Sequence, residues 1–195
     1  MKMLINDPRN VVREALEGLV DLTPGLMLLD SENVVVSAEQ HAASDRGVAV
    51  LSGGGSGHEP AHAGFVAPEM LSGAIAGDVF TSPSVDAIIA GIRAAAGPRG
   101  AVLVVKNYTG DRLNFGLAAE LATAEGIPTE VVVVADDVAL RDIVADERRR
   151  GIAGTVLVHK IIGGAVAMGL SAQEAAAIGR RACAGLGTTG VGLGS

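Results

Sequence analysis

Short apolar runs alternate with helix-forming segments along most of this chain. Three of these runs, Val48–Leu51, Ala101–Val105 and Glu130–Val134, are each followed by glycine or polar residues and then by a new element. Such continuous apolar strands are typical of a parallel sheet that is buried on both faces and whose strands are connected by helices. The sequence therefore predicts an α/β fold with a mostly parallel sheet and helices on both faces. The predicted helices include Ser84–Ala96, Asp111–Glu125 and Thr155–Met168.

The composition predicts a core of small aliphatic side chains and argues against a nucleic-acid partner. Hydrophobic residues make up 49% of the 195 residues, 27 residues are glycine, and only 2% are aromatic. The formal net charge of -7 opposes binding to a phosphate backbone, which requires clustered cations. So few aromatic rings also make it hard to build a stacking surface for single-stranded bases.

Cysteine content and hydropathy point to a reducing compartment. Cys183 is the single cysteine, so no intramolecular disulfide can form. The N-terminus lacks the apolar run of a signal peptide. The most apolar later stretch, Thr155–Leu170, is too short to span a bilayer and contains a histidine and a lysine. We therefore expect a soluble cytoplasmic protein with no membrane partner.

A glycine-rich stretch, Ser52–Pro60, follows the first predicted strand. Its sequence is Ser-Gly-Gly-Gly-Ser-Gly-His-Glu-Pro, and we expect it to form a loop followed by a short helix, Glu59–Phe65. Glycines allow a ligand to approach the backbone amides closely. The stretch is not a Walker A motif, and His58 stands where the third glycine of a dinucleotide-binding fingerprint belongs. A tight turn without any ligand is the alternative interpretation.

Two further loops follow neighbouring predicted strands, at Lys106–Asp111 and at Asp136–Asp137. Because the carboxyl ends of parallel strands meet at one edge of the sheet, we expect these loops to line one site with the glycine stretch. Amides, a lysine, an imidazole and carboxylates suit a small polyhydroxylated molecule. Asp111 is the candidate general base, although it could instead cap the helix that follows. His58 is the candidate partner residue, and helix capping is its alternative role.

The other histidines are assigned to structural or surface roles. His41, His62 and His159 lie outside the predicted loops that carry the candidate chemistry. His58 and His62 have i, i+4 spacing, but Pro60 interrupts the turn between them and no third ligand is evident. We therefore predict no metal site. We also expect a helix over Val138–Ala145.

Several motifs together resemble the K subunit of the dihydroxyacetone kinase family. They run in the same order over essentially all 195 residues: Leu51–Pro60, Met70–Ala74, Val79–Pro83, Lys106–Phe115 and Gly151–Lys160. The resemblance implies a protein that binds dihydroxyacetone or a similar short ketose and presents its terminal hydroxyl for phosphorylation. It implies that Asp111 is the general base and that His58 polarises or orients the substrate. The implied substrate-binding residues are Gly54, Gly55, Ser56, Gly57, His58, Lys106 and Asp111.

The resemblance also implies partners. In the family, the phosphoryl group comes from a separate helical module that holds Mg-ATP or Mg-ADP. That module is either a fused domain or a partner subunit recharged by a phosphotransferase system. No such cofactor is expected on this chain itself. A homodimer and a role in glycerol metabolism are further expectations.

One family feature has no counterpart in the 195 residues. The family carries another histidine, in a second lobe, which forms a covalent hemiaminal with the substrate carbonyl, and no histidine follows His159 here. We therefore expect residues 1–195 to be the first lobe, with the second lobe absent from this chain, and to bind substrate weakly on their own. A non-catalytic paralogue that senses the ketone is the alternative. Lys106 and Asp111 favour the enzyme, because a sensor need not keep a general base.

Overall fold

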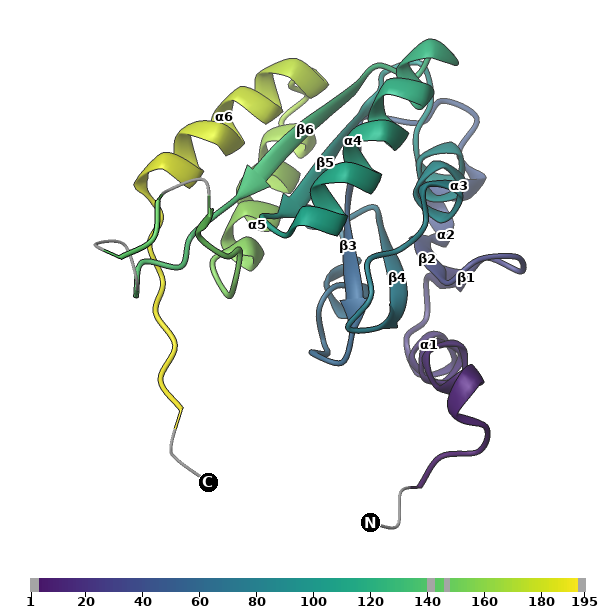
Figure 1. The fold of residues 1–195 in the computed structure, drawn as a ribbon. Coiled ribbons are helices and arrows are strands. Elements are labelled where there is room, and N and C mark those ends of the chain that lie inside the picture. Colours follow the sequence, from purple (N-terminus) through teal and green to yellow (C-terminus); the bar gives the residue numbers. More distant parts are fainter. Residues whose placement is uncertain (1–3, 140–142, 146–147, 193–195) are drawn as a thin grey trace.

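A central sheet, seen in Figure 1, organises the part of the chain that the structure describes. The structure is a computed structural model, and it describes residues 4–139, 143–145 and 148–192. Within these residues the sheet has six strands in the order β1-β2-β4-β3-β5-β6. Their bounds are Leu26–Leu28 (β1), Val34–Ser37 (β2), Ala49–Ser56 (β3), Gly73–Val79 (β4), Ala101–Lys106 (β5) and Thr129–Val134 (β6).

The sheet is mostly parallel, as the sequence predicts. Strands β4, β3, β5 and β6 run parallel to one another, with Leu51 opposite Leu103 and Leu103 opposite Val131. Strands β1 and β2 form an antiparallel edge, and β2 pairs antiparallel with β4. The parallel part brings the carboxyl ends of β3 and β5 together, which is where ligands bind in open α/β sheets.

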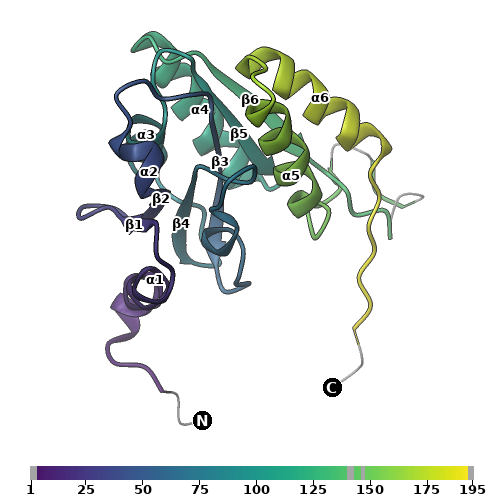
Figure 2. The same cartoon turned by 180° about the vertical axis from the view of Figure 1, so that it is seen from behind.

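Helices cover both faces of the sheet, which confirms the second part of the fold prediction (Figures 1 and 2). Helices α3 (Val85–Ala95) and α4 (Thr109–Ala124) pack on one face. Helices α1 (Val11–Leu22), α5 (Thr155–Ala167) and α6 (Ala172–Gly185) pack on the other. The remaining short elements are α2 (Ala38–Ala42), η1 (Pro8–Asn10) and η2 (Ala63–Phe65).

Each central strand contributes to two hydrophobic cores. On β5, Val102 and Val104 face the core below α5 and α6, whereas Leu103 and Val105 face the core below α3 and α4. All four side chains are completely buried. Because neither face meets water, the strand shows no alternation of apolar and polar residues. Phe115 of α4 is the largest fully buried side chain in the second core.

The glycine stretch differs from the prediction, because most of it is strand. Strand β3 continues through Ser56, with a register shift against β4 after Gly55. At Gly53 the approach of neighbouring elements requires the absence of a side chain, since a Cβ there would collide with the carbonyl oxygen of Ile75 and lie 2.9 Å from the ring of Phe115. The glycines therefore first serve close packing within the sheet.

Two predicted helices are corrected. The segment Glu59–Phe65 contains only the three-residue 3₁₀ helix η2, after a turn that includes Pro60. Residues 138, 139 and 143–145 are not helical, and the rest of the predicted helix, 140–142, lies outside the described residues. None of the helices in the described part of the chain combines the length and apolar character needed to cross a bilayer.

Candidate active site at the carboxyl ends of the strands

The site begins where β5 stops pairing with β3. Val105 of β5 is opposite Gly53, the last β3 residue in that ladder, whereas β4 accompanies β3 as far as Ser56. Lys106 pairs onward with Val134 of β6. Beyond Gly53, one edge of the β3 backbone therefore has no strand partner among the described residues. This edge leaves space for a ligand beside Lys106.

Lys106 and His58 form the cationic side of this space. Lys106 ends β5 and is 8% exposed, while His58 follows β3 and is exposed. Lys106 Nζ lies 2.6 Å from His58 Nε2, so the two side chains are within hydrogen-bond distance of each other. Burial lowers the pKa of Lys106, and the Asp111 carboxylate opposes that shift. The two side chains thus lie in contact at the rim of the site.

Asp111 forms the anionic side. It lies in the first turn of α4 and is 4% exposed. The cap position of α4 is Tyr108, so the alternative in which Asp111 is the N-cap is wrong. Burial raises the pKa of Asp111, and a hydrogen bond from Ser82 together with the charges of Lys106 and His58 opposes the increase. The balance leaves a carboxyl whose pKa is above its ordinary value, as is typical of a general base.

Gly54 marks the centre of the space between these groups. A Cβ on Gly54 would lie 3.5 Å from Asp111 Oδ2 and 3.7 Å from Lys106 Nζ. Both polar atoms therefore face the position where a side chain is missing. A ligand atom next to the Gly54 backbone would meet a carboxylate oxygen and an ammonium at the same time.

The other glycine-stretch residues are placed differently from one another. The Ser56 hydroxyl donates to the carbonyl of Gly77 at 2.8 Å, which holds β3 to β4. The Gly57 amide donates to the Glu59 carboxylate at 3.0 Å. A Cβ on Gly55 would lie 2.5 Å from the Thr81 amide nitrogen, so this glycine lets the segment after β4 approach. Of the sequence-predicted stretch, Gly54 is the residue that lies directly between Asp111 and Lys106.

A cavity of about 380 Å³ adjoins the cationic side of the site. His58, Lys106 and Tyr108 line it together with apolar residues that include Phe65 and Val156. Lys106 Nζ lies 5.7 Å from the centre of the Tyr108 ring. A larger cavity of about 720 Å³ lies between α1 and the ends of β3 and β4, and neither Lys106 nor Tyr108 lines it. Both cavities therefore border the candidate site: the smaller one lies on the side of Lys106 and His58, and the larger one is lined by Gly54, Ser56 and Gly57.

Of the remaining histidines, His62 and His159 line the smaller cavity, and a structural role for them stays a prediction. The ring of His62 lies 5.8 Å from that of His58 and 5.4 Å from that of His159. Burial lowers the pKa of His159 to about 4 and that of His62 well below its usual value, so both imidazoles are neutral at pH 7. His41 contacts a backbone carbonyl of α3 at 2.9 Å. In the described part of the chain, no three His, Cys, Asp or Glu side chains are arranged to hold a metal ion.

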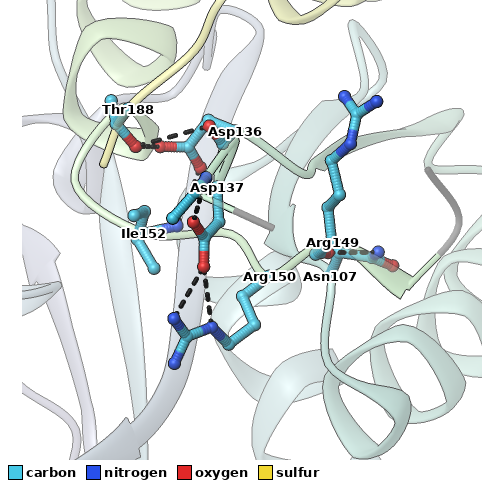
Figure 3. A network of polar contacts seen from close by, with 8 residues as sticks. Asn107, Asp136, Asp137, Arg149, Arg150, Ile152 and Thr188 are labelled. Atoms are coloured by element: carbon cyan, nitrogen blue, oxygen red, sulfur yellow. Dashed lines mark hydrogen bonds and ion pairs between the residues drawn. The ribbon is translucent and has the colours of Figure 1, made fainter. Parts of the chain in front are cut away.

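Asp136 does not face the site, contrary to the expectation that its loop would line it. The carboxylate accepts hydrogen bonds from the backbone amides of Ile152, at 2.7 Å, and Gly154, at 2.8 Å, and one from the Thr188 hydroxyl. Figure 3 shows Asp136 and Thr188 in this network. Asp136 is 1% exposed, and its hydrogen bonds join the segment before α5 to the segment after α6.

Asp137 also forms its contacts within the protein, in an ion pair with Arg150. Its carboxylate accepts two hydrogen bonds from Arg150, at 2.8 and 2.7 Å (Figure 3). The hydrogen bond from the Arg150 guanidinium holds the pKa of Asp137 below its usual range. The sequence pattern of carboxylates after a strand is therefore the same for Asp111 and for these two residues, but their contacts differ.

Replacing Asp136 by alanine is expected to lower the free energy of unfolding by about 3 kcal/mol, because the amides of Ile152 and Gly154 would be left buried without an acceptor. Urea denaturation followed by circular dichroism measures the change. Asp45→Ala is the matched control, since Asp45 forms only an exposed ion pair with Arg99 and should change stability by less than about 0.5 kcal/mol. Equal stability of the two variants would contradict this interpretation of Asp136.

Sequence reasoning missed one polar residue of the site, Ser82. Its hydroxyl donates to Asp111 Oδ1 at 2.5 Å from the segment between β4 and α3. The segment Val79–Pro83 is one of the motifs that resemble the family, but its sequence suggests no role for Ser82. No spacing rule connects a serine with a carboxylate 29 positions later, so only the fold reveals the contact.

Proteins named as kinases or kinase subunits match nearly the whole chain. A Solanum lycopersicum protein assigned as a 3,4-dihydroxy-2-butanone kinase is 56% identical over 195 residues, which cover 98% of this chain and 33% of that protein. The dihydroxyacetone-binding subunit of a PTS-dependent dihydroxyacetone kinase from Listeria innocua is 47% identical, over 99% of this chain and 58% of that subunit. The chain thus spans less than two thirds of the length of these relatives.

A solved structure supports the same relationship. The dihydroxyacetone kinase of C. freundii, crystallised with AMP-PNP and Mg²⁺, superimposes with a TM-score of 0.85 and 42% sequence identity, over 94% of this chain and 34% of that one. Residues 17–195 match the Dak1 domain. Because the match extends over most of the sequence and the fold agrees, this chain belongs to the Dak1 domain family.

Proposed function

We propose that this chain is the ketose-binding part of a dihydroxyacetone (glycerone) kinase. The observation that carries the proposal is the arrangement of Asp111 Oδ2 and Lys106 Nζ around the open position at Gly54. A base and a cation that face one space, beside an unpaired strand edge, suit a small ligand with several oxygens. Membership of the Dak1 domain family and the kinase names of the relatives support the assignment.

In the proposed reaction, Asp111 Oδ2 accepts the proton of the terminal hydroxyl as its oxygen attacks the phosphorus of the donor. The new oxygen–phosphorus bond forms while the bond from phosphorus to its leaving group breaks, and the proton remains on the carboxyl. Lys106 donates to a ketose oxygen, and the adjacent backbone of Gly54 and Gly55 offers further hydrogen-bonding groups. His58 orients the substrate and lies within hydrogen-bond distance of Lys106.

The donor is proposed to lie on a separate nucleotide-binding subunit or fused domain, as Mg-ATP or as Mg-ADP recharged through a phosphotransferase system. Both arrangements have support among the relatives. The C. freundii structure contains AMP-PNP and Mg²⁺, and the Listeria subunit is named as PTS-dependent. We also propose that the enzyme is a cytoplasmic homodimer in glycerol metabolism, an expectation that rests on the resemblance of its sequence motifs to the dihydroxyacetone kinase family.

The proposal is tested by the formation of dihydroxyacetone phosphate in the full-length enzyme, with Mg-ATP in one arm and a phosphoenolpyruvate-driven relay in the other. Lys106→Met is expected to lower kcat/KM at least about tenfold, since it removes a charged hydrogen-bond donor from the substrate. Lys160→Met is the matched control, because Lys160 is an exposed residue of α5 that pairs with Glu69.

Three outcomes would overturn the proposal. The first is the absence of product in both arms. The second is binding of the ketone without turnover, which would favour the non-catalytic paralogue. The third is a Lys106→Met variant that keeps the kcat/KM of the wild type. If both lysine variants lost activity, the loss would not be specific to Lys106, which would contradict its assigned role in binding the substrate.

A further inference from the structure

The segment Phe80–Pro83, between β4 and α3, is fastened to the strand and the helix that carry the candidate site. The Phe80 amide donates to the carbonyl of Ser56 on β3 at 2.9 Å. On the other side, Asn114 Nδ2 of α4 donates to the carbonyl of Pro83 at 2.7 Å. Because Asn114 lies one turn after Asp111, the same helix holds both the segment and the carboxylate.

Three glycines allow this segment to lie so close. A Cβ on Gly55 of β3 would lie 2.5 Å from the Thr81 amide nitrogen, and one on Gly77 of β4 would overlap the Thr81 carbonyl. A Cβ on Gly110 of α4 would lie 2.6 Å from Ser82 Oγ. Each of the three elements thus lacks a side chain at the point where the segment crosses it. The position of Ser82 is therefore determined from three directions.

The consequence is a carboxylate with one oxygen occupied and one directed to the site. Ser82 Oγ lies 2.5 Å from Asp111 Oδ1, while Asp111 Oδ2 faces the open position at Gly54. A hydroxyl donor on Oδ1 fixes the rotation of the carboxylate about its last bond. We propose that Ser82 is a positioning residue, which aims Oδ2 of the general base Asp111 at the substrate hydroxyl. This inference rests on the proposed function.

Electrostatics makes the inference measurable. The charged or titratable groups that face Asp111 are Lys106 at the end of β5 and His58 after β3. Burial raises the pKa of Asp111, and the Ser82 hydrogen bond is the largest influence that opposes it. Removal of the hydroxyl must therefore raise the pKa of Asp111 further. Since the base acts only as a carboxylate, the acid limb of the pH profile would move to higher pH.

The test measures kcat and KM for dihydroxyacetone against pH in the full-length enzyme and in Ser82→Ala. The pH at which kcat is half-maximal on the acid side of the profile is expected to increase by about one unit. At pH values below this midpoint kcat should therefore fall about tenfold, while KM changes less than about threefold. Ser82→Thr keeps the hydroxyl and should restore the limb. Ser82→Cys, with a weaker donor, should give an intermediate limb and serves if the alanine variant does not fold.

Ser84→Ala is the matched control. The Ser84 hydroxyl caps α3 by accepting from the Ala87 amide at 3.1 Å, so this variant loses a local hydrogen bond two residues away from Ser82. Its stability should fall while its acid limb stays at the position of the wild type. A Ser82→Ala enzyme with the wild-type limb would overturn the inference, and so would an equal loss of kcat at every pH.

The outcome is separable from that of the proposed function. If the wild-type enzyme forms no dihydroxyacetone phosphate, the proposed function fails before Ser82 is examined. If the wild type is active and Asp111→Asn is inactive, but the limb of Ser82→Ala does not move, then only the role of Ser82 is wrong.

Discussion

Asparagine in place of Asp111 is expected to lower kcat of the full-length enzyme at least about 100-fold, with KM for dihydroxyacetone within about threefold of the wild type. Asparagine has nearly the same shape and still accepts the hydrogen bond from Ser82, but its amide cannot take up the proton of the attacking hydroxyl. The loss therefore falls on the chemical step. Steady-state assays of product formation measure it, and an unchanged kcat would remove Asp111 from the mechanism.

The same substitution should not cost stability. The pKa of Asp111 is raised in the folded state, so protonated Asp111 favours folding below its ordinary value near 3.8, and this contribution is lost as the pH rises through the folded-state pKa. At pH 7 the wild type has lost it, whereas asparagine never ionises. Thermal unfolding of Asp111→Asn at pH 7 should therefore give a Tm at least as high as that of the wild type. A markedly lower Tm would show that the ionised carboxylate stabilises the fold.

Alanine in place of Gly53 is expected to lower the free energy of unfolding by about 3 kcal/mol. A Cβ at this position would collide with the backbone carbonyl of Ile75 on β4, and it would also press on the buried ring of Phe115. Neither the strand backbone nor a completely buried ring can move aside without loss of packing. Urea denaturation of the two proteins gives the difference.

Gly116→Ala is the matched control, with the opposite sign. Gly116 lies inside α4, next to Phe115 in sequence, and a Cβ there would have no atom within 4 Å. Alanine in a helix interior is expected to stabilise by about 0.5–1 kcal/mol, because glycine loses more backbone entropy on folding. Wild-type stability of Gly53→Ala would show that the strands separate easily at this point.

The parallel sheet was predictable because its physical cause lies in local composition. A run such as Ala101–Val105 contains no polar residue for water to meet, and only a strand covered on both faces can bury every side chain of it. The extent of β3 was not predictable in the same way. Glycine has little intrinsic preference for strands, and Gly53 is in a strand because it pairs with Ile75 of β4 and Val105 of β5.

The candidate site was predictable in part. Lys106 and Asp111 follow the end of one buried strand, and topology brings that end next to Gly54. Asp136 follows the next strand with the same local pattern, yet its carboxylate accepts hydrogen bonds from the backbone amides that precede α5. Whether a carboxylate is available to a ligand depends on contacts with distant backbone. Sequence spacing carries no information about those contacts.

The neutrality of His62 and His159 has a consequence for product release. With these imidazoles uncharged, Lys106 and Asp111 supply opposite charges on the two sides of Gly54. In the proposed reaction, a ketose enters this site without a charge of its own and is converted to a phosphate ester that carries two negative charges. With the transferred proton on Asp111, Lys106 is the cation beside the ester, and the neutral imidazoles add no second positive charge that would hold the dianion more strongly. The small number of positive charges on the inner wall therefore limits how strongly the site retains its product.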